Sequence, residues 1–386
     1  MAGLSAEPVS SCGLYIHVPF CLRKCFYCDF YSIPYSPARA VRFLAALTQE
    51  ISIRAQNPPF AERRFSSLYF GGGTPSLLTT KQLAKMLSAV NSAFGFAPGA
   101  EISLEANPAT LSLAQLRELR AAGISRLSLG VQSLQEAELH TLGRLHTGRQ
   151  ARQMFQAARK AGFDNLSIDL IYAVPGQTIA SWEATLREVL VWRPEHISVY
   201  ALTLEENTPI ARAVANGTLT PKSPEMQRSM FLIAHELLTA HGYEHYEISN
   251  YALPSRRCRH NELYWRRDPY LGLGPSAHSF HDKERWWNHA NMDLYCEALS
   301  GGTLPVAQKE TLSPEQEDLE RIMLSLRTAE GLDLGACAPT LTRKLRQRAT
   351  LLADNCQQAI LIVDKDRIHL TPHGFLVHDE VCRLLA

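Results

Sequence analysis

The chain has 386 residues, of which 46% are hydrophobic, and its 39 Lys and Arg residues nearly balance its 38 Asp and Glu residues. This length and composition predict one large domain with a sizeable core and a smaller one. The near-neutral net charge argues against binding through overall electrostatic attraction, so we expect no nucleic acid partner. No apolar run predicts a transmembrane segment, and the first residues lack a signal-peptide pattern, so a cytoplasmic location is expected.

Six strand–helix units are predicted in order along the first two-thirds of the chain. We expect strands at residues 13–18, 67–70, 101–105, 126–131, 166–172 and 196–202. We expect helices at residues 38–54, 80–94, 113–122, 150–161, 179–192 and 225–241. This alternation is typical of a parallel α/β fold. Six units rather than the eight of a TIM barrel predict an open, partial (β/α)6 barrel with a lateral gap.

The rest of the chain follows a different pattern. Residues 243–302 are rich in Tyr, Trp, His, Arg and Gly without a strand–helix rhythm, and we expect an extension of the core. Helices at 314–327 and 341–355, a hairpin at 359–363 and 367–370, and a last helix from residue 371 predict a small winged-helix-like α/β domain. We therefore divide the chain into a short N-terminal arm (1–12), a barrel (13–242), the extension (243–302) and a C-terminal domain (303–386).

Three cysteines, Cys21, Cys25 and Cys28, follow the first predicted strand with the spacing Cys-x3-Cys-x2-Cys. The chain's nine cysteines do not form a disulfide framework, and a reducing compartment favours metal binding by this group. A structural zinc site needs four protein ligands, of which His17 could supply the fourth. A four-iron cluster held by three thiolates instead keeps one iron open for a small molecule. The spacing after a first barrel strand resembles the radical S-adenosylmethionine signature, which favours the cluster.

Glycines and polar residues stand where the predicted strands end, which is the active-site end of a parallel barrel. The run Gly71-Gly72-Gly73-Thr74-Pro75 follows the second strand, and its glycines allow a ligand to approach the backbone closely. Glu105, at the end of the third strand, can accept a hydrogen bond from an ammonium group. Each of these residues has the alternative interpretation of an ordinary turn or a satisfied polar side chain.

Three more polar residues extend this set. Gln132 and Asp169, at the ends of the fourth and fifth strands, suit the hydroxyl groups of a ribose. Arg144 can bind a carboxylate through two parallel hydrogen bonds from its planar guanidinium. Together these side chains offer a partner for each polar part of S-adenosylmethionine, although each one alone fits a structural role equally well.

The chain is similar to the oxygen-independent coproporphyrinogen oxidase (HemN) superfamily of radical S-adenosylmethionine proteins. The resemblance rests on His17-Val18-Pro19-Phe20-Cys21, the glycine run, Gly130-Val131-Gln132-Ser133, Val174-Pro175-Gly176-Gln177 and Gly272-Leu273-Gly274-Pro275-Ser276-Ala277-His278-Ser279. It implies a 4Fe-4S cluster on Cys21, Cys25 and Cys28. It also implies contacts to S-adenosylmethionine from Tyr15, Tyr27, Gly72, Gly73, Thr74, Glu105, Gln132, Arg144, Asp169 and Ala201.

Three features point to one branch of this superfamily. Phe30 stands where the oxidases have a further cysteine, and the N-terminal arm is short. The run His260-Asn261-Glu262-Leu263-Tyr264-Trp265 resembles the His-Asn-x-x-Tyr-Trp pattern of the HemW group. This resemblance implies a haem chaperone that delivers haem to apo-haemoproteins such as respiratory enzymes, and it leaves a homodimer open. The alternative is an enzyme, an oxygen-independent coproporphyrinogen III oxidase; we lean toward a carrier without catalytic residues.

The candidate haem contacts are His260, Tyr264 and Trp265, because imidazole is a common axial ligand and flat rings suit a porphyrin. His278 and Cys258 are further possible axial ligands, and the sequence does not choose among the three. The alternative is that His260 braces the barrel mouth while the two aromatic rings are core. The neighbouring arginines at positions 256, 257, 259, 266 and 267 could meet haem propionates or be solvated.

Overall fold

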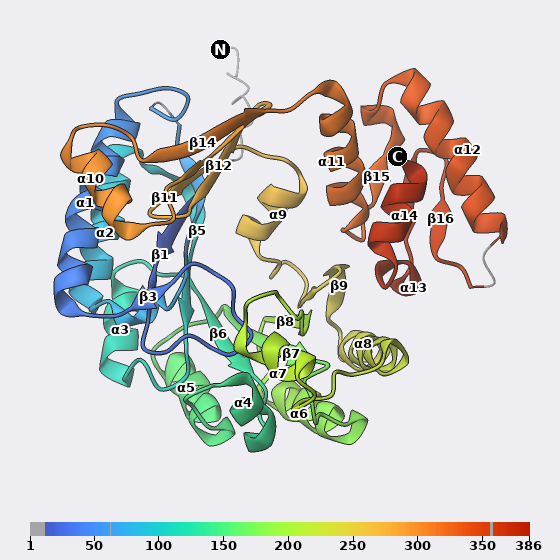
Figure 1. Ribbon diagram of the computed structural model, residues 1–386, viewed down its shortest axis with the longest axis horizontal. Coiled ribbons are helices and arrows are strands. Elements are labelled where there is room, and N and C mark those ends of the chain that lie inside the picture. Colours follow the sequence, from blue (N-terminus) through green and yellow to red (C-terminus); the bar gives the residue numbers. More distant parts are fainter. Residues whose placement is uncertain (1–11, 62, 356–357) are drawn as a thin grey trace, which may run out of the picture.

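The structure is a computed structural model that describes residues 12–61, 63–355 and 358–386 (Figure 1). Residues 1–11 of the predicted N-terminal arm lie outside this range. A curved sheet covered by helices forms the larger part of the molecule, and a small C-terminal unit of helices and short strands lies beside it (Figure 1).

Seven neighbouring strands form the parallel centre of the large sheet. In spatial order they are β11 (Tyr270–Leu273), β1 (Gly13–Val18), β4 (Phe65–Gly72), β5 (Phe96–Ala106), β6 (Arg126–Gln132), β7 (Leu166–Tyr172) and β8 (His196–Ala201). Antiparallel strands extend both edges: β12 (His278–His281), β13 (Glu284–Asn288) and β14 (Val306–Thr311) beyond β11, and β10 (Asn250–Ala252) and β9 (Glu244–Glu247) beyond β8. The sheet is therefore open, as six strand–helix units predict.

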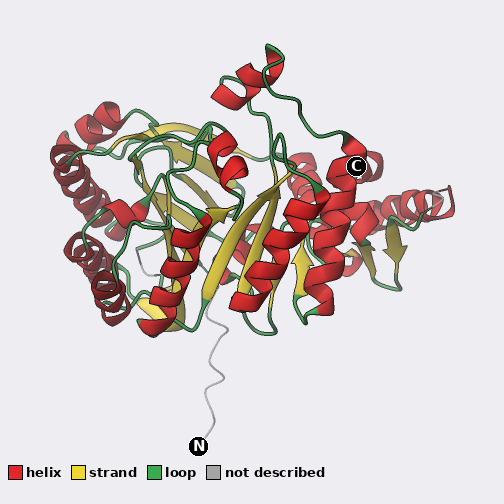
Figure 2. Cartoon of the chain, turned by 90° about the horizontal axis from the view of Figure 1, so that it is seen from below, coloured by secondary structure: helices red, strands yellow, loops and turns green. Residues whose placement is uncertain are grey.

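Helices pack against the outside of the curved sheet (Figure 2). Those of the barrel are α1 (Pro37–Ala55), α2 (Thr80–Ala93), α3 (Leu113–Ala121), α4 (Glu136–Leu142), α5 (Gly148–Lys160), α6 (Ile179–Trp192), α7 (Pro209–Ala215) and α8 (Pro224–Ala240), with a 3-10 turn η1 (Pro75–Leu77). Two more, α9 (Arg259–Trp265) and α10 (Met292–Ser300), belong to the segment after the barrel. The starts of these helices are encoded locally: Thr79 with Gln82 and Ser112 with Gln115 form capping boxes at α2 and α3.

The core lies between the sheet and these helices. Along β1 every residue except Tyr15 is buried, as expected for a strand with helices on one face and a filled barrel on the other. The longer helices bury one apolar stripe each, which for α5 consists of Ala151, Met154, Phe155 and Ala158. This packing holds the carboxyl ends of the parallel strands in fixed positions around the barrel interior.

The C-terminal unit has the winged-helix-like order that the sequence predicts. Its elements are α11 (Pro314–Leu326), β15 (Leu332–Asp333), η2 (Leu334–Ala336), α12 (Pro339–Asn355), β16 (Leu361–Val363), β17 (Arg367–Leu370), α13 (Pro372–Phe375) and α14 (His378–Leu385). The three strands form a separate small sheet. Within the described ranges, no helix combines the length and the apolar character that crossing a membrane requires.

The segment after residue 242 contains more sheet than its irregular sequence suggests. β11 pairs in parallel with β1, and β12, β13 and β14 continue the same sheet in antiparallel order. β14 spans Val306–Thr311, so the large sheet extends past residue 302, where we placed the start of the C-terminal domain. The four-residue strands β11 and β12 are too short to show a clear alternation of apolar and polar residues.

Candidate functional site: a cavity through the barrel

The cysteine loop lies at the carboxyl end of β1. Its first cysteine is on the short strand β2 (Phe20–Cys21), which pairs with β3 (Ile33–Pro34). Cys21, Cys25 and Cys28 are free thiols that are partly buried, and they line a cavity of about 620 Å³. All three therefore face one space.

The donors around these thiols favour thiolate ligands. Arg144 Nη1 donates to Cys25 Sγ at 3.3 Å, and Thr74 Oγ1 lies 3.7 Å from Cys21 Sγ. Burial raises the pKa of Cys28 to about 11 without a metal, so a bound cation would have to displace its proton. The cavity therefore supplies side-chain donors to the sulfurs of Cys25 and Cys21.

A zinc site that uses His17 does not fit the structure. The Nδ1 atom of His17 lies 3.2 Å from the Tyr15 hydroxyl, and its Nε2 atom lies 2.9 Å from the carbonyl oxygen of Tyr31. Both ring nitrogens are thus engaged away from the cysteines. Among the residues with described positions, no three His, Cys, Asp or Glu side chains are grouped closely enough to hold a single metal ion.

The glycine run at the end of β4 packs closely against the cysteine loop. Gly72 has a φ of +105°, which side-chain-bearing residues rarely adopt. A Cβ atom on Gly73 would lie 2.6 Å from the carbonyl oxygen of Phe20. Both glycines and Thr74 line the cavity. The local backbone therefore requires glycine at these two positions and brings the strand end next to the cysteines.

Two carboxylates face the cavity from β5 and β7, the strands on either side of β6. Glu105 on β5 accepts a hydrogen bond from the Tyr69 hydroxyl at 3.0 Å. Burial, together with the negative charge of Asp169, raises the pKa of Glu105 to about 7. Asp169 on β7 accepts from Ser128 Oγ, which lies 3.0 Å from each carboxylate oxygen. Its pKa is also raised, mainly by burial. A ligand that offers a positive charge or hydrogen-bond donors would stabilise the ionised form of both carboxylates.

Asn107, which the sequence analysis did not select, connects the glycine run with Arg144. Its Nδ2 atom donates to Thr74 Oγ1 at 3.0 Å, and its Oδ1 atom accepts from Arg144. Arg144 also donates to the carbonyl oxygen of Gly130 at 2.6 Å. Gln132 lies beside this pair with a positive φ of 66° at the end of β6. The only sequence signal for Asn107 is its place two residues after Glu105.

The weaker candidates, Tyr27 and Ala201, line the same cavity. Tyr27 lies close enough to Arg144 for a side-chain hydrogen bond, and burial raises the pKa of its hydroxyl. Ala201 ends β8 and contributes backbone at the rim. With these two, every residue that the sequence analysis selected for S-adenosylmethionine or for the cluster borders one space.

Helix α9 closes the opposite, amino end of the barrel. Its Leu263 and His260 pack so tightly on Gly13, the first residue of β1, that a Cβ atom there would lie 2.8 Å from Leu263. His260 and Tyr264 line the cavity, whereas Trp265 does not. The Trp265 ring lies 4.4 Å from the Arg327 guanidinium of the C-terminal unit. The cavity therefore runs through the barrel from the cysteine loop to α9.

His260 is held by its neighbours through both ring nitrogens. Its Nδ1 atom lies 2.8 Å from Ser67 Oγ, and its Nε2 atom lies 2.8 Å from the Tyr264 hydroxyl. Burial, together with the charge of Arg126, lowers the pKa of His260 to about 3, so the ring is neutral. A bond from His260 to iron would need one of these hydrogen bonds to break. These contacts agree with the alternative that His260 has a bracing role. The histidine braces the amino end of the barrel, however, and not its mouth.

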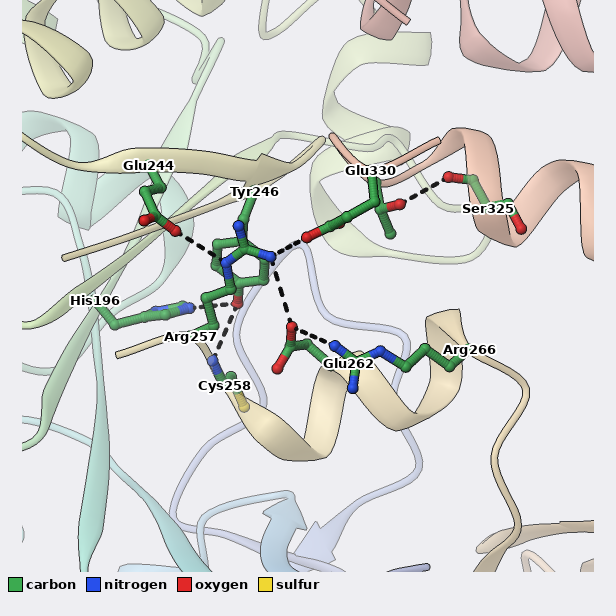
Figure 3. A network of polar contacts seen from close by, with 10 residues as sticks. His196, Glu244, Tyr246, Arg257, Cys258, Glu262, Arg266, Ser325 and Glu330 are labelled. Carbon is green, nitrogen blue, oxygen red and sulfur yellow. Dashed lines mark hydrogen bonds and ion pairs between the residues drawn. The ribbon is translucent and has the colours of Figure 1, made fainter. Parts of the chain in front are cut away.

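A network of polar contacts connects α9 with the C-terminal unit (Figure 3). Arg257, just before α9, forms ion pairs with Glu330 and with Glu244, the latter at 3.0 Å. Its guanidinium also lies over the Tyr246 ring, whose hydroxyl is 2.8 Å from His196. The residues before and within α9 therefore contact both the barrel interior and the C-terminal unit.

Comparisons with known proteins agree with this architecture. The Radical SAM superfamily matches residues 15–189, and the HemN C-terminal domain family matches residues 312–377. The chain is similar in structure to coproporphyrinogen III oxidase (HemN) from Escherichia coli, with a TM-score of 0.83 and 27% identity, covering 99% of this chain and 91% of that one.

Curated relatives cover nearly the whole chain. Heme chaperone HemW of Mycobacterium tuberculosis is 37% identical over 100% of this chain and 97% of its own length. Heme chaperone HemW of Bacillus subtilis is 32% identical over 95% of this chain and 97% of its own length. Given this full-length similarity and the radical SAM barrel described above, the chain belongs to the HemW family of radical S-adenosylmethionine proteins.

Proposed function

We propose that this protein is a haem chaperone that binds a 4Fe-4S cluster, S-adenosylmethionine and haem, and delivers haem to apo-haemoproteins such as respiratory enzymes. One observation carries the proposal: a single cavity extends from the cysteine loop to α9, the helix with the His-Asn-x-x-Tyr-Trp pattern. The name heme chaperone HemW of the full-length relatives supports it. We also propose that the protein acts in the cytoplasm, and a homodimer stays open.

In this proposal Cys21, Cys25 and Cys28 hold the cluster. When bound, such a cluster supplies an electron and an open iron position for the methionine group of S-adenosylmethionine. Arg144 neutralises charge at Cys25, to which it already donates a hydrogen bond. The exposed backbone at Gly72 and Gly73 and the Glu105 carboxylate accept from the ammonium group, while Gln132 and Asp169 bind the ribose hydroxyls.

The proposed haem contacts are His260 and Tyr264, because both reach the cavity. Trp265 acts indirectly in this proposal, since its ring packs beneath Arg327 and not toward the cavity. Haem would enter the part of the cavity beyond the cofactor contacts, where α9 closes the barrel.

A second candidate function is the oxidative decarboxylation of coproporphyrinogen III. The structural similarity to E. coli HemN over 99% of the chain favours it. Phe30 argues against it, because this side chain is 65% exposed at the place of the further cysteine of the oxidases and offers no ligand. No catalytic residue is assigned in the carrier proposal.

The two functions are separated by parallel assays on one preparation. The cluster is reconstituted without oxygen, and the protein is then tested for coproporphyrinogen decarboxylation and for haem binding followed by transfer to an apo-haemoprotein. Haem binding and transfer without decarboxylation are expected. Robust decarboxylation would contradict the carrier proposal.

A further inference from the structure

Arg126, the first residue of β6, places an unpaired positive charge at the inner end of the cavity. The residue lines the cavity, and only 1% of its surface is exposed. Its Nε and Nη1 atoms have no hydrogen-bond partner among the described residues. An arginine stays charged in a protein, and a buried charge without a partner is unfavourable. Nearby groups, Glu101 among them, stabilise the charge through space, but the N–H groups at Nε and Nη1 have no acceptor among the described residues.

Three carboxylates that act on or near Arg126 accept hydrogen bonds from other donors, Glu101 through its Oε1 atom. Glu101 accepts from the backbone N–H of His260 at 3.4 Å and lies 3.7 Å from Cys258 Sγ. Glu105 accepts from Tyr69, and Asp169 accepts from Ser128. These carboxylates influence Arg126 through space, yet none forms an ion pair with it in the part of the chain that the structure describes.

The other arginines considered for haem propionates have partners within the protein. Arg256 pairs with Asp164, Arg257 with Glu244 and Glu330, Arg266 with Glu262, Arg267 with Glu320, and Arg259 donates to the carbonyl oxygen of Gly99. Arg144 is committed to the cysteine loop. Arg23, the third arginine that lines the cavity, is exposed and donates to the carbonyl oxygen of Gly143 at 2.8 Å. Arg126 is thus the buried cavity arginine whose Nε and Nη1 atoms have no hydrogen-bond partner among the described residues.

A layer of flat rings lies beside Arg126 at the inner end of the cavity. The Tyr69 ring stacks on His260 with centroids 5.2 Å apart, and Tyr15 stacks on both, at 6.4 Å from each. All three residues line the cavity. Such a wall suits a flat aromatic ligand, and the adjacent guanidinium suits a carboxylate on that ligand.

We propose that Arg126 binds a propionate carboxylate of the haem cargo and thereby selects porphyrins that carry free carboxylates. This inference rests on the proposed haem-carrier function. In the bound state an N–H group of Arg126 that lacks a partner would donate to a carboxylate oxygen. The residue would act as a specificity determinant of the cargo site, with no part in a chemical step.

The test compares binding of ferric protoporphyrin IX with binding of its dimethyl ester, in which both propionates are uncharged. Titrations followed by porphyrin absorbance are done on the cluster-loaded full-length protein, on Arg126→Gln and on Arg256→Gln. We expect the unsubstituted protein to prefer the free acid about tenfold, which matches the loss of one charge-assisted hydrogen-bonded contact. Arg126→Gln should lose this preference, and Arg256→Gln, the surface control, should keep it.

The outcomes separate the two proposals. If the unsubstituted protein binds neither porphyrin, the haem-carrier function fails. If it binds haem but Arg126→Gln keeps the full preference for the free acid, or if the unsubstituted protein shows no preference, the assignment of Arg126 is wrong. If Arg126→Gln shows no cooperative thermal unfolding, Arg126→Lys replaces it. Arg126→Lys keeps the positive charge but loses the planar guanidinium. Its preference for the free acid over the dimethyl ester should fall at least about threefold, and an unchanged preference would overturn the proposal.

Discussion

At the residue scale, Glu105 is a carboxylate that titrates near neutral pH, since its pKa is raised to about 7 by burial and by Asp169. A proton and the ammonium group of S-adenosylmethionine would compete for it. Deprotonation above this pKa favours the ligand, so affinity should rise about tenfold from about pH 6 to about pH 8 and then level off. Isothermal titration with S-adenosylmethionine on cluster-loaded protein measures this rise.

Two variants show whether Glu105 is the group responsible. Glu105→Gln cannot titrate, so its weaker binding should be independent of pH over the same range. Glu205→Gln removes another carboxylate that lines the cavity and should keep the pH dependence. A pH profile that survives in Glu105→Gln would assign the titration to a different group.

The cysteine loop gives a second prediction at this scale. Replacing Cys25 with Ala removes one of three thiolates and the sulfur that Arg144 contacts, so the broad absorbance of a reconstituted four-iron cluster should disappear. Cys337→Ala, in the C-terminal unit, should retain it. Metal analysis of the same samples decides the nature of the site, because zinc in place of iron would contradict the cluster.

Residue types and positions predicted much of the site because strand ends of a parallel barrel converge. Glycine at positions 72 and 73 is required by local geometry, which a sequence pattern expresses directly. Asn107 and Arg126 could not be predicted in the same way. Asn107 belongs to the site because it hydrogen-bonds to Thr74 and Arg144. Arg126 stands out because two of its guanidinium nitrogens have no hydrogen-bond partner among the described residues. Both properties depend on packing between elements far apart in sequence.

At the element scale, α9 is the structural connection between the cavity and the C-terminal unit. One face of the helix carries His260 and Tyr264 into the cavity, while Trp265 lies under Arg327. Arg257 adds ion pairs with Glu244 and Glu330 just before the helix (Figure 3). A change in how the C-terminal unit docks would therefore be felt at the inner end of the cavity through this helix, while β9 and α8 also contact the unit.

Arg327 makes this connection testable. It pairs at 2.8 Å with Glu247, whose side chain is fully buried and whose pKa is raised mainly by burial. Arg327→Gln would leave that carboxylate without its cation and should lower the free energy of unfolding by about 3 kcal/mol at about pH 8. Loss of the cation raises the pKa of Glu247 further, so protonation should reduce the defect at about pH 5. Urea unfolding at both pH values measures it.

The double variant is the control for this prediction. Glu247→Gln combined with Arg327→Gln removes both charges and should recover part of the stability that Arg327→Gln loses. A defect that is equal at both pH values and unchanged in the double variant would indicate lost packing on Trp265 rather than an unpaired carboxylate.

The success of the sequence-based prediction varied with element length. The six strands and the six predicted helices of the barrel have long, regular patterns, and the structure confirms their order. The seven-residue helices α4 and α7 were not predicted. β11 and β12, with four residues each, escaped prediction, because short buried strands show no periodicity and their pairing with β1 and β13 is non-local. The same non-local pairing of β13 with β14 carries the large sheet past residue 302.

At the scale of the whole molecule, an open barrel closed at one end by α9 leaves a single cavity for the proposed ligands. The cysteine loop and strand ends lie at one end, and the aromatic wall with Arg126 lies at the other. Ligand cavities of about 300–1,000 Å³ usually enclose one ligand of drug size. The volume of about 620 Å³ lies within this range, so haem and S-adenosylmethionine would lie close together and compete for part of the same space.

Haem and S-adenosylmethionine should therefore weaken each other's binding. Because coupling between two equilibrium binding sites is reciprocal, haem must reduce the affinity for S-adenosylmethionine by the same factor by which S-adenosylmethionine reduces the affinity for haem. We expect a factor of about 5–150, the usual range for coupled sites. Titrations of each ligand with and without a saturating amount of the other measure both factors on cluster-loaded protein. Unequal factors would point to a change of assembly during the titration, and factors of one would place haem outside this cavity.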